Sequence, residues 1–162
     1  MCNVVVNASP LIVLAKADLL RLMPALFSEI FLPQAVREEI SQGPPDDPMR
    51  KALPSCTWLR PVVLAPSLSP LSVWQLGRGE AEVIEYARLH PAVAALPDDR
   101  AARRAAAGLG VKVRGTLSVE AMGVAQGHIE SFSVAVKQLR AAGMYASDTL
   151  VETVAKALRA GT

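Results

Sequence analysis

Short, wholly apolar runs alternate with helical segments along most of this chain, and this alternation restricts the fold more than any other feature. Residues 4–6 are three consecutive valines, which is typical of a strand in a parallel sheet that is covered on both faces. Further strands are expected at residues 29–32, 57–64, 93–96 and 111–113. Pro61 weakens the strand at 57–64 and favours an edge or irregular position. The sequence therefore predicts an α/β fold with a mostly parallel sheet.

The expected helices are placed by their capping residues and their apolar periodicity. Ser9 is expected to be the N-cap of the first helix, with Pro10 as its first residue. This helical region is expected to stop near Pro24. The other main helices are expected at residues 33–41, 76–89, 99–109, 116–126, 131–142 and 147–159, and a loop is expected at residues 66–70. The length of 162 residues suits a single domain spanning 1–162.

Composition limits the core, the metal chemistry and the compartment. Apolar residues make up 51% of the chain but aromatic residues only 4%, so aliphatic side chains and alanine must fill the core. Two cysteines without paired spacing give neither a disulfide framework nor a zinc site. The chain shows no basic segment before its first apolar run and no apolar run near the ~20 residues that span a bilayer. A cytoplasmic protein without membrane contact is expected.

Polar side chains follow two of the predicted strands. Asn7 comes directly after the strand at 4–6, and Asp98 and Asp99 come just after the strand at 93–96. Ligand sites of parallel sheets lie in the crevice beyond the carboxyl ends of the strands. These three side chains are therefore expected to project into one crevice.

Two further acids are selected by helical geometry. Glu39 and Glu80 each fall on the apolar stripe of their expected helix, where an unpaired charge is costly. Glu38, Glu82 and Glu85 fall on the opposite faces and are expected to be solvated. Glu39 and Glu80 are thus directed toward the core side.

Each of these residues also has a purely structural interpretation. Glu39 and Glu80 can pair with Arg or Lys, Asp99 can cap the helix that follows it, and Asn7 can be a turn residue. Taken together, the oxygen-bearing side chains suit Mg²⁺ or Mn²⁺, which would relieve their mutual repulsion. A stretch without acids follows them, and its cations Arg100, Arg103 and Arg104 are candidates for binding an RNA backbone.

Five segments in order along the chain resemble the PIN-domain superfamily, and more narrowly the DUF3368 branch, which is related to VapC-type toxins. These segments are residues 5–12, 32–40, 79–84, 96–103 and 115–119, and residues 143–148 are similar to the C-terminal segment of that branch. The resemblance implies a three-layer α/β/α fold. It also implies a Mg²⁺- or Mn²⁺-dependent site that cleaves single-stranded RNA. Members of this family are often homodimers, and the toxins pair with an antitoxin protein.

The resemblance also implies roles for individual residues. By position, Glu39, Glu80, Asp98 and Asp99 are the catalytic candidates. Asn7, Glu80, Asp98 and Asp99 are the metal-binding candidates, and either aspartate can be the ligand. Asn7 stands where PIN nucleases place their first aspartate, so it brings a carbonyl oxygen but no charge.

Two functions from different classes follow from this pattern. The first is a metal-dependent, PIN-type ribonuclease that cleaves single-stranded RNA phosphodiesters, with the toxin of a toxin–antitoxin pair as its specific form. The alternative is a non-catalytic PIN-like module that binds RNA or protein. The neutral Asn7 is the feature that favours the alternative.

Overall fold

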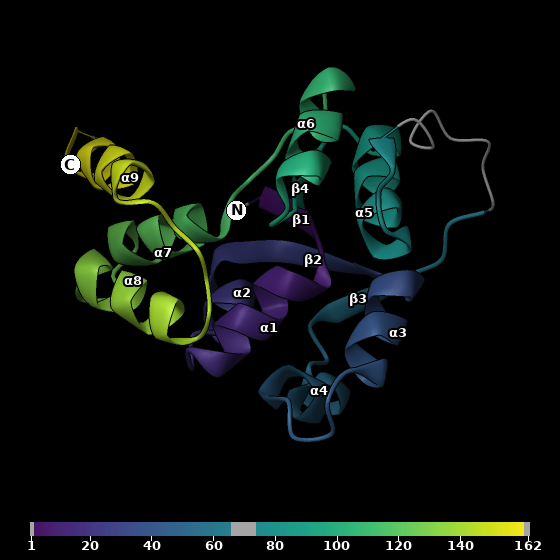
Figure 1. Cartoon of the computed structure of the whole chain (residues 1–162), viewed down its shortest axis with the longest axis horizontal. Coiled ribbons are helices and arrows are strands. Elements are labelled where there is room, and N and C mark those ends of the chain that lie inside the picture. Colours follow the sequence, from purple (N-terminus) through teal and green to yellow (C-terminus); the bar gives the residue numbers. More distant parts are fainter. Residues whose placement is uncertain (1, 66–73, 161–162) are drawn as a thin grey trace.

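The computed structural model describes residues 2–65 and 74–160, which form a four-stranded parallel sheet in the order β3-β2-β1-β4 (Figure 1). The strands are β1 (Cys2–Val6), β2 (Phe27–Pro33), β3 (Leu59–Val62) and β4 (Val93–Leu96). The predicted α/β fold with a mostly parallel sheet is confirmed. The loop expected at residues 66–70 lies outside the described residues.

β1 is an inner strand, and this explains its run of valines. Val4, Val5 and Val6 are all fully buried. Val5 is in register with Phe31 of β2, and Val6 with Leu96 of β4. Because the strands are parallel, β1, β2 and β4 all end at the same edge of the sheet. The residues that follow these strands therefore start close together.

Two expected strands differ from the prediction. The strand expected at 57–64 is shorter and lies at the edge of the sheet, where Pro61 is tolerated. Residues 111–113 form no strand, and an isolated parallel bridge joins Val113 to Ala95. This segment is short, and it follows Gly110, whose positive φ of 67° turns the chain just before it.

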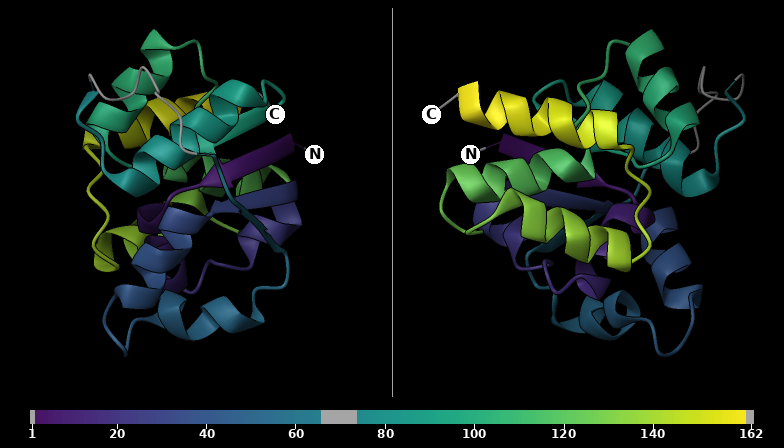
Figure 2. Two further views of the ribbon diagram at one scale, coloured as in Figure 1. Left: turned by 90° about the vertical axis from the view of Figure 1, so that its right-hand side faces the viewer. Right: turned by 60° about the vertical axis from the view of Figure 1, so that its left-hand side comes forward.

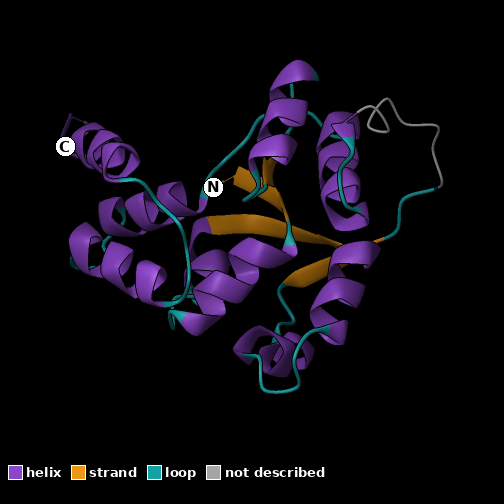
Figure 3. Ribbon diagram, viewed as in Figure 1, coloured by secondary structure: helices purple, strands orange, loops and turns teal. Residues whose placement is uncertain are grey.

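The helices cover both faces of the sheet, which gives the expected three-layer α/β/α arrangement (Figure 3). They are α1 (Ala8–Lys16), α2 (Leu22–Leu26), α3 (Gln34–Gln42), α4 (Pro48–Ala52), the 3-10 helix η1 (Leu53–Ser55), α5 (Arg78–Leu89), α6 (Arg100–Gly108), α7 (Thr116–Ala125), α8 (Phe132–Ala141) and α9 (Asp148–Ala160). α5 packs against α3 and α6, whereas α7 packs against α2, α8 and α9. The right-hand view of Figure 2 shows α7 lying between α9 and α8.

Two predicted helix boundaries are wrong. The N-cap of α1 is Asn7 rather than Ser9, which is exposed and lies inside the helix. α2 runs through Pro24 to Leu26. A proline in the first turn of a helix costs no hydrogen bond, because the N–H groups there have no intrahelical partner.

The core is aliphatic, as the composition predicts. Its largest fully buried side chains are Leu11, Leu14, Leu22, Met23, Leu26, Ile30, Ile40, Met49, Ile84, Leu96, Leu139 and Glu120. α6 contributes only alanines to this core, and α9 contributes no buried residue. Within the described residues, no helix is both long and apolar enough to cross a membrane.

Candidate active site

Asn7 is fixed where β1 ends. Its backbone N–H donates to the carbonyl of Leu96 at 3.3 Å, which ties the end of β1 to the end of β4. Its side chain is 4% exposed, and Oδ1 accepts a hydrogen bond from the N–H of Ala8 at 2.8 Å. A carbonyl oxygen has two lone pairs, so Oδ1 has capacity for a second partner.

Gly79, near the start of α5, lies where side-chain oxygens from two other elements converge. A β-carbon at this residue would be 3.0 Å from Oε2 of Glu39, 3.3 Å from Cγ2 of Val36 and 3.5 Å from Oδ1 of Asn7. The glycine therefore leaves the room in which these two oxygen atoms approach the same point. The structure thus brings together two of the residues selected from the sequence.

Glu80 follows Gly79 and places a second carboxylate near that of Glu39. Partial burial of the Glu39 carboxylate and the nearby charge of Glu80 both raise the pKa of Glu39. One carboxylate oxygen of Glu80 also accepts a hydrogen bond from the N–H of Gly77 at 3.1 Å, which closes the first turn of α5. Asn7, Glu39 and Glu80 are called the oxygen cluster below.

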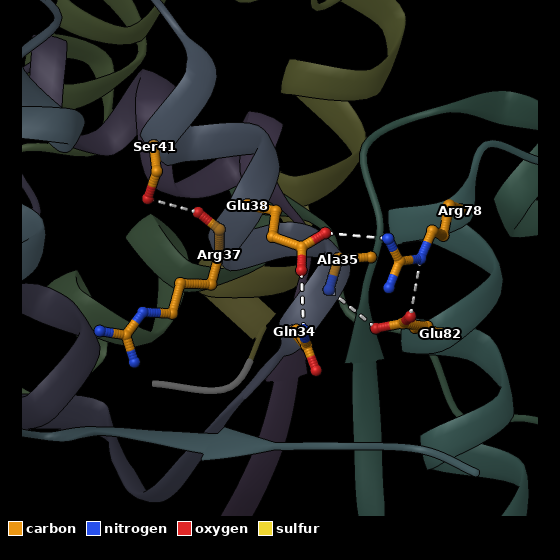
Figure 4. Close-up of polar contacts among 7 residues, drawn as sticks. All are labelled: Gln34, Ala35, Arg37, Glu38, Ser41, Arg78 and Glu82. Carbon is orange, nitrogen blue, oxygen red and sulfur yellow. Dashed lines mark hydrogen bonds and ion pairs between the residues drawn. The ribbon is translucent and has the colours of Figure 1, made fainter. Parts of the chain in front are cut away.

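The neighbouring acids hold α3 beside α5 (Figure 4). Arg78 of α5 pairs with Glu38 of α3 at 2.8 Å and with Glu82 of its own helix at 3.3 Å. The other oxygen of Glu82 accepts a hydrogen bond from the N–H of Ala35 at 2.9 Å, in the first turn of α3. These four residues are called the clamp, and they keep the two helices in the register that sets Gly79 against Glu39.

The predicted exposure of these acids is wrong. Glu39 is an exposed residue, although its carboxylate lies over Gly79. Glu82 is only 18% exposed, and Glu85, which pairs with Arg88, is buried. For Glu82 and Glu85 the reason is that α5 is covered by α3 and α6 as well as by the sheet, so more than one stripe of the helix is buried.

Asp98 and Asp99 have different surroundings despite being adjacent. Asp99 is the N-cap of α6, and its Oδ2 accepts from the N–H groups of Ala101 at 2.6 Å and Ala102 at 3.3 Å. Asp98 is half-buried. Burial raises the pKa of Asp98, the guanidinium of Arg103 lowers it and the charge of Asp99 raises it, with a net upward shift. Asp99 therefore has a structural task, and Asp98 has no such hydrogen bond in the described part of the chain.

A cleft of about 770 Å³ opens beside Asp98. It lies between the start of α1, the starts of α6 and α7, the segment before α9, and α9 itself. Ser9, Asp98, Asp99, Arg100, Arg103 and Thr116 line its inner part, and residues from Met144 to Val154 line its other wall. The oxygen cluster does not line this cleft. It adjoins the cleft through the hydrogen-bonded ends of β1 and β4.

The three arginines predicted to bind RNA do not share one position. Arg100 and Arg103 line the cleft, whereas Arg104 is exposed and does not. The guanidinium of Arg103 lies against Gly115, where a β-carbon would be 2.7 Å from Nη2. Gly115 therefore permits the position of Arg103 between α6 and the start of α7.

The family model of DUF3368, described as a PIN domain, matches residues 3–160. The chain belongs to this family of PIN domains. This match confirms the resemblance seen in the sequence. No curated protein and no solved structure matched the chain.

Membership of the PIN family gives the site a chemical context. PIN domains are generally nucleases and typically use divalent metal ions. The chain accordingly has a nuclease-type fold, and RNA is the kind of partner that this family suggests.

The oxygen cluster fits a hard divalent cation in the type of its donors. Mg²⁺ and Mn²⁺ prefer carboxylate and carbonyl oxygens and keep several water ligands. Two such oxygens, Asn7 Oδ1 and Glu39 Oε2, approach the same point beside Gly79. Among residues 2–65 and 74–160, no group of three or more His, Cys, Asp and Glu side chains lies close enough to hold an ion. The acids of the described residues therefore do not form a complete metal site by themselves.

Sequence reasoning missed the importance of Gly79 and of the clamp. Gly79 has no functional group, so only its place directly before Glu80 at a helix start could have indicated its role. Arg78 and Glu82 are four residues apart in sequence, a spacing that favours an ion pair on one helix. Their contacts with α3 depend on tertiary packing, which leaves no local pattern.

Proposed function

We propose that this PIN domain is a metal-dependent endoribonuclease that hydrolyses phosphodiesters of single-stranded RNA. The observation that supports this best is the convergence of Asn7 Oδ1 and Glu39 Oε2 beside Gly79. These two oxygens come from separate elements, and a glycine at this position lets them approach the same point. Family membership supports the nuclease chemistry.

The residues have distinct proposed roles. Asn7, Glu80 and Asp98 would hold Mg²⁺ or Mn²⁺, and Glu39 would orient the attacking water. A bound divalent cation would neutralise charge that develops on the phosphoryl group. Asp99 keeps its place as the cap of α6, since both of its accepted hydrogen bonds come from that helix.

The cleft would receive the RNA next to the scissile phosphate. Arg100 and Arg103 line it and supply positive charge for the backbone, as phosphate binding requires. We place the protein in the cytoplasm, as the toxin of a toxin–antitoxin pair that forms a homodimer. This part of the proposal rests on the likeness to VapC-type toxins.

A non-catalytic role, in which the same fold binds RNA or a protein, is the second candidate. Two oxygens of the cluster already accept backbone hydrogen bonds, Asn7 from Ala8 and Glu80 from Gly77. In this role the cluster would cap helices and nothing more. Mn²⁺ then would not bind, and RNA would be retained without cleavage.

Thermal unfolding with Mn²⁺ and with EDTA tests the metal site, and cleavage of a labelled single-stranded RNA tests the chemistry. We expect Mn²⁺ to raise the melting temperature and to support cleavage. The Glu80→Gln variant should lose both effects, because glutamine lacks the charge but keeps an oxygen that can accept from Gly77. This variant therefore separates metal binding by Glu80 from its role in capping α5.

Glu130→Gln is the matched control, because it removes one exposed acid between α7 and α8. It should respond to Mn²⁺ as the unaltered chain does. Equal melting temperatures in Mn²⁺ and EDTA for the unaltered chain, without cleavage, would contradict the nuclease proposal and favour the binding module.

A further inference from the structure

Tyr145 differs from every other aromatic residue of the chain. The sequence contains three Phe, two Trp and two Tyr, all within the described residues. Six of them lie in the core or pack against it: Phe27, Phe31, Trp58, Trp74, Tyr86 and Phe132. Tyr145 is 85% exposed. A chain with so few aromatic residues thus presents one of them to solvent.

The backbone on both sides of Tyr145 is anchored. Met144 and Ala146 are each 8% exposed, so the residues before and after the ring face the protein. The N–H of Met144 donates to the carbonyl of Leu139 at 3.0 Å. Arg140 donates to the carbonyl of Ala146 at 2.7 Å and pairs with Asp148, also at 2.7 Å. The ring is therefore held outward by a fixed segment between α8 and α9.

The ring stands at the wall of the cleft that contains the cationic side chains. Tyr145 lines this cleft together with Arg100, Arg103 and Asp98. Proteins that bind single-stranded nucleic acid combine positive charge for the backbone with aromatic rings on which bases stack. Both components are present among the residues that line this cleft. Bases of a duplex are already stacked and paired, so a ring in this position recognises an unpaired base.

We propose that Tyr145 stacks on an unpaired base of the RNA next to the cleaved bond and makes the site selective for single strands. This inference rests on the proposed nuclease function and identifies a residue that determines its specificity. Arg100 and Arg103 can contact phosphates beside Asp98 and Asp99, and the nuclease-type fold favours RNA over a second copy of this chain as the occupant.

Fluorescence anisotropy of a labelled single-stranded oligoribonucleotide, measured in EDTA so that no cleavage occurs, tests the proposal. Tyr145→Ala should weaken binding roughly five- to a hundredfold, which corresponds to the loss of one base–aromatic stack. Tyr145→Phe and Tyr145→Trp should bind like the unaltered chain, because each keeps a planar ring. Binding of duplex RNA should be equal for all four proteins.

Val63→Ala is the matched control, because Val63 is 78% exposed and lies outside the cleft. It should leave RNA binding unchanged. The melting temperature of Tyr145→Ala should also be unchanged, since the ring is not part of the core. An abasic nucleotide at the stacked position should remove the difference between Tyr145→Ala and the unaltered chain.

Equal affinity of Tyr145→Ala and the unaltered chain for single-stranded RNA would overturn this inference. If the unaltered chain still cleaves RNA in that case, the proposed function stands and only the role of Tyr145 fails. If the unaltered chain neither binds nor cleaves RNA, both fail. Loss of a dimer in Tyr145→Ala with unchanged RNA affinity would overturn the inference in favour of an interface between copies.

Discussion

At the scale of single residues, the role of an acid depends more on the position of its backbone than on its chemical type. Asp98 and Asp99 are identical in type and adjacent in sequence. Asp99 has an extended backbone immediately before α6, so its carboxylate reaches the free N–H groups of that helix. Asp98, one residue earlier, lies in the cleft beside Arg103. The sequence leaves the choice between them open, and the cap geometry leaves Asp98 as the aspartate of the proposed metal site.

A substitution at Asn7 can test the proposed activity, because it is expected to increase metal affinity. Asn7→Asp adds a carboxylate while keeping an oxygen that can accept from Ala8. We expect it to bind Mn²⁺ roughly tenfold or more tightly, because a charged oxygen attracts the cation more strongly than an amide oxygen. Isothermal titration of Mn²⁺ and the rate of RNA cleavage measure the effect. Tighter Mn²⁺ binding without any cleavage would indicate a metal-binding module rather than a slow nuclease.

At the scale of elements, the clamp shows why α3 and α5 meet in one register. The side chain of Arg78 is 65% exposed and that of Glu38 is 40% exposed, so each ion pair contributes at most about 1 kcal/mol to stability. Their value is geometric, since the clamp positions Gly79 beside the carboxylate of Glu39. Stability and metal binding should therefore respond differently when the clamp is broken.

Arg78→Met tests this separation, because methionine keeps part of the apolar stem and loses the charge. We expect unfolding in urea to show a loss of about 1 kcal/mol or less. The rise in melting temperature caused by Mn²⁺ should fall by more than half. Arg88→Met is the matched control, since Arg88 pairs with Glu85 of the same helix. An equal loss of the Mn²⁺ response in both variants would show that the clamp does not position the site.

The limits of prediction from sequence are also clearest for the elements. The buried strands at residues 4–6 and 93–96 were predictable because they consist of consecutive apolar residues. The burial of Glu82 and Glu85 was not, because a helical wheel supposes one buried stripe. Neighbours on several sides of α5 bury more than one. The N-cap of α1 was misplaced because Asn7, Ser9 and Pro10 lie within four residues and offer several good helix starts.

At the scale of the whole molecule, the order of strands and helices was enough to predict a parallel α/β fold, whereas the interior of the helical layer was not predictable. Glu120 of α7 is fully buried, and neither of its carboxylate oxygens has a hydrogen-bond partner among the described residues. The same is true of Oγ1 of Thr116, one turn earlier. Burial raises the pKa of Glu120 from its ordinary value of 4.5 to about 8.

This buried acid should make the stability of the whole chain depend on pH. The folded state holds this proton more tightly than the unfolded state, so the contribution of Glu120 to stability is largest below pH 4.5 and falls as the pH rises toward 8. The slope from this group is roughly 1.4 kcal/mol for each pH unit. Urea unfolding across this range should show the decline in the unaltered chain and a smaller decline in Glu120→Leu.

Glu120→Leu should also be the more stable protein at the alkaline end, because it buries no charge. Glu152→Gln, which removes an exposed acid of α9, should leave the pH dependence as it is. Parallel curves for Glu120→Leu and the unaltered chain would mean that Glu120 is solvated or paired in solution.

Gly79 would give a misleading result in an alanine scan of this fold. An alanine scan usually finds active-site residues by removing their functional groups, but at this position alanine adds a methyl group. That group would lie within 3.5 Å of two oxygen atoms of the oxygen cluster. The scan would report a loss where no chemical group had been deleted. A residue without a side chain can thus be as sensitive to replacement as the acids around it.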